Sequence, residues 1–111
     1  MADLQTIIAQ AGPLPIKVAA NVETDAPAVV MVAGSVWSVD QEYIVGFMLS
    51  IDGAQAAAPQ IFANSAAMHL AVVPVTFSYT FSIGEHVFEL DKLTGETMSD
   101  ANDVYFVNLL Y

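Results

Sequence analysis

The chain has 111 residues, 56% of them hydrophobic, and sets twelve aspartates and glutamates against two lysines, for a formal net charge of −10. Nucleic-acid binding and attraction to an anionic membrane both need basic groups, so neither partner is expected. The absence of cysteine removes disulfides, a thiolate nucleophile and a cysteine-built zinc site.

The length predicts a single domain over residues 1–111. No basic segment followed by an apolar stretch opens the sequence, and no apolar run reaches the roughly 18 to 20 residues that span a bilayer. We therefore expect no signal peptide and no transmembrane segment, and a cytoplasmic or virion-associated location.

The first 14 residues form an N-terminal arm that fits either a short helix or an edge strand. Apolar residues at positions 4, 7, 8 and 11 have helical spacing, and Asp3 is a candidate N-cap. Thr6–Ile8 reads equally well as a strand. Gly12 and Pro13 would end a helix in either case.

From Ile16 onward the hydrophobic pattern has the period of two that is typical of strands. The predicted strands cover 16–24, 28–37, 43–51, 69–73, 75–83, 86–91 and 103–111. Residues 54–68 are expected to be irregular with a strand near 60–63, a short helix being the alternative, and 93–102 is a polar loop with room for a short strand. Asp25–Pro27 and Asp52-Gly53 are turn signals. The fold class is therefore all-β, as two antiparallel sheets in a sandwich.

Three predicted strands, 28–37, 43–51 and 103–111, are apolar on nearly both faces, and we assign them to one sheet covered by a neighbouring subunit. Fourteen charged residues are too few to coat a monomer, which favours a homo-oligomer. The expected contact uses Val30, Val32, Tyr105, Val107, Leu109 and Tyr111. Phe106 and Leu110 would then fill the core, although strand alternation permits the reverse. The Ser/Thr face of 75–83 should meet solvent.

The second half of the chain carries a pattern of short motifs. They are Ile51-Asp52-Gly53, His69–Pro74, Phe81–Leu90 with its Gly84-Glu85-His86 turn, Thr97–Asp103 and Tyr105-Phe106-Val107. Over roughly residues 28–111 this resembles jelly-roll domains of the tumour-necrosis-factor-like superfamily, including the globular heads of complement proteins. The resemblance implies a jelly-roll sandwich and a homotrimer with the last strand at the subunit interface. It fixes no partner.

The candidate ligand residues favour structural roles. His69 and His86 lack the spacing of a zinc site, and both are expected to be structural. Ser99–Asp103 has the oxygens that calcium prefers, but Asp and Asn also cap turns, which is the favoured interpretation. Glu89 and Asp91 share a strand face, and a solvated acidic rim is expected rather than a glycosidase pair.

We expect a homotrimeric jelly-roll module with a structural or protein-binding role, without catalysis, cofactor or metal. One alternative is a carbohydrate-binding module of the same fold, with its site between subunits or at the connections 38–42 and 54–66. A further alternative is a small metal-assisted enzyme that uses His69, His86 and nearby carboxylates.

Overall fold

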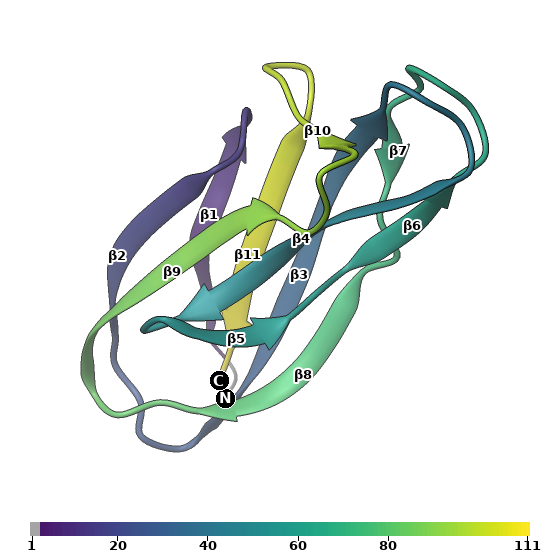
Figure 1. The fold of residues 1–111 in the computed structure, drawn as a ribbon. Coiled ribbons are helices and arrows are strands. Elements are labelled where there is room, and N and C mark those ends of the chain that lie inside the picture. Colours follow the sequence, from purple (N-terminus) through teal and green to yellow (C-terminus); the bar gives the residue numbers. More distant parts are fainter. Residues whose placement is uncertain (1–2) are drawn as a thin grey trace.

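The computed structural model describes residues 3–111 as two antiparallel sheets packed face to face (Figure 1). The first sheet holds β1 (Leu4–Ala11), β3 (Pro27–Ser38), β7 (Leu70–Ala71), β8 (Val75–Thr80), β10 (Thr97–Met98) and β11 (Val104–Leu110). The second holds β2 (Ile16–Val22), β4 (Tyr43–Ile51), β5 (Ala54–Ala57), β6 (Gln60–Ala63) and β9 (Gly84–Lys92). The predicted all-β jelly-roll sandwich is confirmed. Within residues 3–111 no helix is long and apolar enough to cross a membrane.

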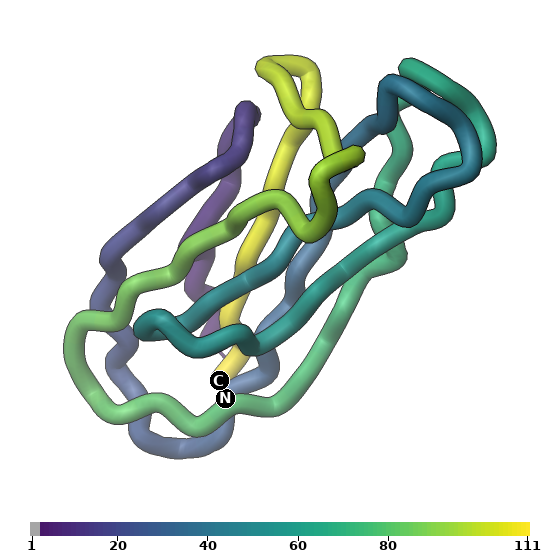
Figure 2. The backbone as a smooth tube through the Cα atoms, in the orientation of Figure 1, coloured from purple at the N-terminus to yellow at the C-terminus, as the bar shows by residue number. Residues whose placement is uncertain are grey.

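The longest strand, β3, organises the first sheet. Its 12 residues pair with β11 along one edge and with β8 and β7 along the other, and β1 continues the sheet beyond β11. In the second sheet β9 lies between β2 and β4, and β5 and β6 both pair with β4. Figure 2 shows the chain crossing between the two layers several times, so that strands distant in sequence become neighbours.

The core lies between the sheets and consists of alternate residues of the long strands, as the period of two requires. The rings of Phe47 from β4 and Tyr105 from β11 meet edge to face with centroids 5.1 Å apart, and both side chains are fully buried. Gly34 of β3 leaves room for them, since a Cβ there would lie 2.7 Å from Cδ1 of Tyr105. The central packing therefore needs a residue without a side chain at position 34.

The predicted subunit contact is wrong in its choice of strand face. Five of the six predicted side chains are at most 1% exposed within a single chain and form part of the core: Val30, Val32, Tyr105, Val107 and Leu109. Tyr111 is half-buried and packs against that core. The alternation is reversed, because Phe106 and Leu110, expected inside, are 41% and 37% exposed.

The grouping of the apolar strands also differs from the prediction. β3 and β11 are neighbours in the first sheet, whereas β4 belongs to the second. The short connection between β3 and β4 crosses from one layer to the other, and this crossing has no signature in the hydrophobic pattern. The apolar inner face of β4 therefore meets β3 and β11 across the core rather than beside them.

The N-terminal arm is an edge strand, β1, so the strand interpretation of this segment is correct. The predicted spans of β4 and β6 agree with the structure, and the Ser/Thr face of β8 is exposed as expected. Among the differences, β5 was not predicted, β7 covers only Leu70–Ala71 of the predicted 69–73, and β8 ends at Thr80. Ile83, the last residue of the predicted strand 75–83, lies beyond β8 and is 65% exposed.

Candidate functional site

Several connections gather at one end of the sandwich, the upper end in Figure 1. They are the β3–β4, β6–β7 and β10–β11 connections. The backbone N–H of Ala67 donates to the carbonyl of Ser38 at 2.7 Å, and that of Glu42 donates to Ala63 at 2.6 Å. These hydrogen bonds join the first two connections, so the loops form one supported surface.

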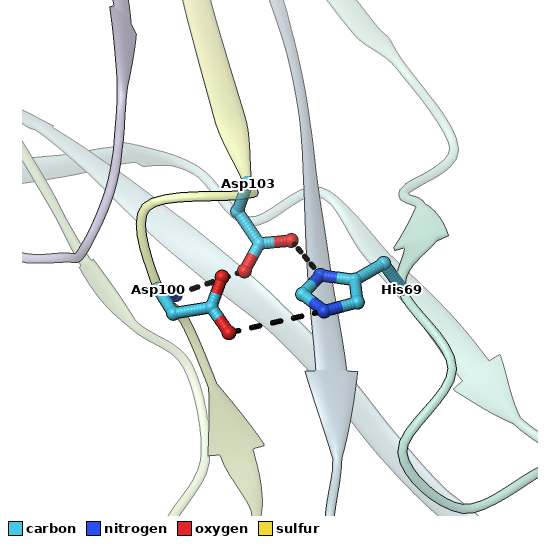
Figure 3. Close-up of side chains that lie close together, drawn as sticks. All are labelled: His69, Asp100 and Asp103. Carbon is cyan, nitrogen blue, oxygen red and sulfur yellow. Dashed lines mark hydrogen bonds and ion pairs between the residues drawn. The ribbon is translucent and has the colours of Figure 1, made fainter.

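At this end the structure brings together three potential metal ligands, His69, Asp100 and Asp103, which come from two connections (Figure 3). Nδ1 of His69 lies 2.7 Å from Oδ1 of Asp103, and its Nε2 lies 3.8 Å from Oδ2 of Asp100. One candidate atom from each residue lies within 4.8 Å of the others. The sequence separation of His69 and Asp103 hides this grouping from any motif search.

Asp103 is the fixed member of the group, because its fully buried carboxylate accepts several hydrogen bonds. Oδ1 accepts from the hydroxyl of Ser35 at 2.8 Å as well as facing His69, and Oδ2 accepts from the backbone N–H of Asp100 at 2.9 Å. Asp100 in turn accepts from the N–H of Asn102 at 2.8 Å. These bonds confirm the capping interpretation of the Ser99–Asp103 corner.

The surroundings of His69 favour its protonated form. The hydrogen bond to Asp103 is the main cause that raises the pKa of His69 above its ordinary value, and Asp100 adds a smaller attraction. The indole of Trp37 lies against the imidazole with ring centroids 5.7 Å apart. The contacts with the two carboxylates therefore favour the protonated imidazole of His69 more than water does.

The arrangement of Ser35, Asp103 and His69 differs from a nucleophilic triad. In a triad the imidazole lies between the hydroxyl and the carboxylate and removes the hydroxyl proton. Here the carboxylate lies between the other two groups, and Oδ1 of Asp103 contacts both. The hydroxyl of Ser35 donates a hydrogen bond to Asp103, and no imidazole lies beside it to activate it as a nucleophile.

The second histidine, His86, belongs to a different cluster. Its Nδ1 faces Asp52 and its Nε2 faces the carbonyl of Ser82 at 2.7 Å. The structure thus pairs each histidine with its own carboxylates, and His69 and His86 do not share a site in the described residues. This removes the arrangement that the metal-assisted enzyme alternative requires.

A cavity of about 160 Å³ opens at the same end, between the β3–β4 and β9–β10 connections. Its lining residues are Ser38, Val39, Asp40, Gly95, Glu96 and Met98. Ser38 is only 1% exposed, and its hydroxyl has no hydrogen-bond partner among residues 3–111. The cavity thus combines two carboxylates with an apolar thioether and a valine.

Three of the six residues that line this cavity, Ser38, Val39 and Asp40, belong to the 38–42 connection that the sequence suggested for glycan binding. The other suggested connection, 54–66, does not line it. Gly95, Glu96 and Met98 were not identified as site residues from the sequence. Pairing of Met98 with Trp37 and of Thr97 with Ser38 brings them to the cavity, and this pairing has no local sequence signal.

No family model matches the chain, and neither does any curated protein sequence. Solved structures resemble it, and three of them do so at 10–13% sequence identity. The exo-β-1,3-galactanase of Phanerochaete chrysosporium, solved with β-1,3-galactotriose, covers 99% of this chain at a TM-score of 0.47 and 10% identity. The chain corresponds to only 26% of that enzyme's length.

The other two are small domains of similar size. A CBM36 domain of a multidomain xylanase from the hindgut metagenome of Trinervitermes trinervoides covers 99% of the chain, and 94% of its own length is matched, at a TM-score of 0.41 and 11% identity. A carbohydrate-binding module CBM36 in complex with calcium and xylotriose matches over 98% of this chain and 98% of its own length, at a TM-score of 0.43 and 13% identity. These values describe the sandwich alone. None of the three is named as a tumour-necrosis-factor-like domain, so that finer resemblance gains no support.

Proposed function

We propose that this chain is a non-catalytic carbohydrate-binding module whose site is the cavity between the β3–β4 and β9–β10 connections. The observation that carries the proposal is the lining of the cavity, which places Asp40 and Glu96 beside Val39 and Met98. This composition fits a neutral sugar, because a sugar presents both hydroxyl groups and an apolar C–H face.

The carboxylates define the polarity of the ligand. Ionised Asp40 and Glu96 can only accept hydrogen bonds, so the ligand must donate them. Sugar hydroxyls donate readily. An anionic ligand would instead meet two carboxylates on a chain whose net charge is −10, and like charges disfavour such a contact. Neutral glycans are therefore favoured over uronic-acid polymers.

The size of the cavity supports a small binding unit. A volume of about 160 Å³ is well below the roughly 300 Å³ at which drug-sized pockets begin. One sugar ring, or one end of an oligosaccharide, matches this space better than an extended chain. The expected affinity is correspondingly modest, with most contacts made by a single unit.

Affinity electrophoresis against soluble neutral polysaccharides (xylan, galactan and β-glucan), followed by calorimetry with the matching oligosaccharides, tests the proposal. We expect retardation on at least one polysaccharide. Asp40→Asn and Glu96→Gln should each weaken binding about tenfold, as expected for loss of a charge-assisted hydrogen bond.

Asp91→Asn is the matched control, because Asp91 is an exposed carboxylate on β9 outside the cavity. It removes one charge without touching the site and should leave binding unchanged. No retardation on any of the glycans, or equal weakening by all three variants, would refute the proposed site.

A further inference from the structure

The charges of this chain are segregated between the two sheets. None of the fourteen charged residues lies in a strand of the six-stranded sheet. Five of them lie in β2 and β9 of the other sheet, namely Lys17, Glu85, Glu89, Asp91 and Lys92, and the rest lie in turns, connections or the N-terminal segment. The outer face of the six-stranded sheet is therefore uncharged on a molecule of net charge −10.

The pairing of β1, β11 and β3 shows what this face carries. Ala9 lies opposite Phe106, which lies opposite Ala33, and Leu4 lies opposite Leu110, which lies opposite Val29. With Met31, Ala11 and Val104 these side chains form an exposed or half-buried surface, here named the apolar face: Leu4, Ala9, Ala11, Val29, Met31, Ala33, Val104, Phe106 and Leu110. Between its two rows lie the uncharged polar side chains of Thr6 and Asn108, which pair with each other and, through Asn108, with Met31.

The apolar face has a polar border on one side. Thr76, Ser78 and Thr80 of β8 are exposed and pair with Met31, Val29 and Pro27 of β3. An apolar centre with an uncharged polar border is the usual composition of a contact between proteins. Stable monomers rarely expose apolar patches of more than a few hundred Å² without such a role.

The size of the face suits a specific contact. With the polar border on β8 included, four strands at ~4.8 Å spacing and seven residues at ~3.3 Å give roughly 19 by 23 Å, or about 450 Å² per copy before side-chain relief is counted. Two such faces approach the total of about 1,000 Å² that separates specific contacts from weak packing.

We propose that the apolar face binds a second copy of this chain, with the two faces packed about a twofold axis. Charge selects this partner. On the other sheet, β9 presents Glu85, Glu89 and Asp91, so a head-to-tail contact with that strand would place carboxylates against an apolar surface and strip their water. A twofold contact instead pairs the uncharged face with itself, which is how isologous dimers form. Threefold order was implied by the family resemblance alone.

Sedimentation equilibrium on the full chain tests this proposal. The wild type should have twice the chain mass of 11.8 kDa at micromolar concentration. Phe106→Glu places two carboxylates in the centre of the contact and should weaken dimerisation by at least about 100-fold. Since Phe106 is already 41% exposed, the variant should keep its fold, and circular dichroism checks this directly.

Phe62→Glu is the matched control, because Phe62 is 49% exposed on β6 of the other sheet and undergoes the same chemical change. It should remain dimeric. A wild-type mass of 11.8 kDa at high micromolar concentration, or a trimeric mass, would overturn the proposal. So would a folded Phe106→Glu variant that stays dimeric. Glycan binding through the cavity could still hold in each of these cases.

Discussion

Nδ1 of His86, on β9, lies 2.5 Å from Oδ2 of Asp52, which is in the turn that joins β4 to β5. The other carboxylate oxygen accepts the backbone N–H of Val87 at 2.8 Å. Asp52 and Gly53 both have positive φ, 52° and 85°, which is the geometry of the two-residue hairpin turn that this sequence pair favours. One aspartate thus shapes the turn and ties it to β9.

The His86–Asp52 pair predicts a pH window of stability. The hydrogen bond to Asp52 raises the pKa of His86, and the same bond lowers the pKa of Asp52. Because the pKa of His86 is raised, its pairing stabilises the fold fully below pH 6.5, and this stabilisation is lost as the pH rises through the pKa of the folded state. Because the pKa of Asp52 is lowered, its pairing stabilises the fold above pH 3.8, and this stabilisation is lost as the pH falls through the folded pKa. The Tm difference between wild type and Asp52→Asn should therefore be largest between these limits. A difference independent of pH would contradict this.

Removing the Asp103 carboxylate should destabilise the fold strongly. Asp103→Ala leaves Ser35, His69 and the N–H of Asp100 without their acceptor at a position that is 0% exposed. The expected loss is about 2–4 kcal/mol, measured by urea unfolding. Asp100→Ala removes a half-exposed carboxylate of the same corner and should cost under about 1 kcal/mol. Equal losses in the two variants would show that the buried carboxylate is not the organising group.

Gly34→Ala should disturb the central packing. The added methyl would lie 2.7 Å from Tyr105 and 2.9 Å from Phe47, whose rings are buried and packed against each other. Overpacking of this kind costs roughly 1–3 kcal/mol of unfolding free energy. Gly95→Ala is the control, since its Cβ would meet no atom within 4 Å. Thermal unfolding followed by tyrosine fluorescence separates the two, and a Gly34→Ala variant as stable as wild type would refute the packing argument.

Calcium and chelators should leave the stability unchanged. Three carboxylate oxygens at the His69 corner already accept hydrogen bonds from the chain itself, so a cation would have to displace them. Differential scanning fluorimetry with excess calcium, and separately with EDTA, should give the same Tm. A rise of several degrees in calcium would identify the corner as a metal site, because a ligand that binds only the native state stabilises it.

The hydrophobic pattern predicted strands well but could not assign them to sheets. β4 and β6 were predicted with their observed spans because alternation is a local property of the backbone. The choice between Val107 and Phe106 as the buried residue depends on which side the second sheet lies, and two apolar faces look alike in sequence. Whether β4 joins the first or the second sheet depends on the path of the connection 39–42. The polar residues of this connection are compatible with either path, so the sequence does not predict it.

The candidate sites were harder to predict from the sequence than the fold was. The capping role of the Ser99–Asp103 corner could be predicted because Asx turns are local. Its partner His69 could not, since the contact joins residues 34 positions apart. The cavity likewise depends on the pairing of β10 with the end of β3, and two-residue strands such as β10 carry almost no periodic signal.

The two ends of the described chain are held together. Asp3 and Tyr111 exchange backbone hydrogen bonds in both directions, and both lie at the opposite end of the sandwich from the cavity (Figure 1). A short linker could therefore join them and new ends could be opened in a surface loop without breaking a sheet hydrogen bond. The fold is in effect cyclic, and a circularly permuted gene should encode the same sandwich.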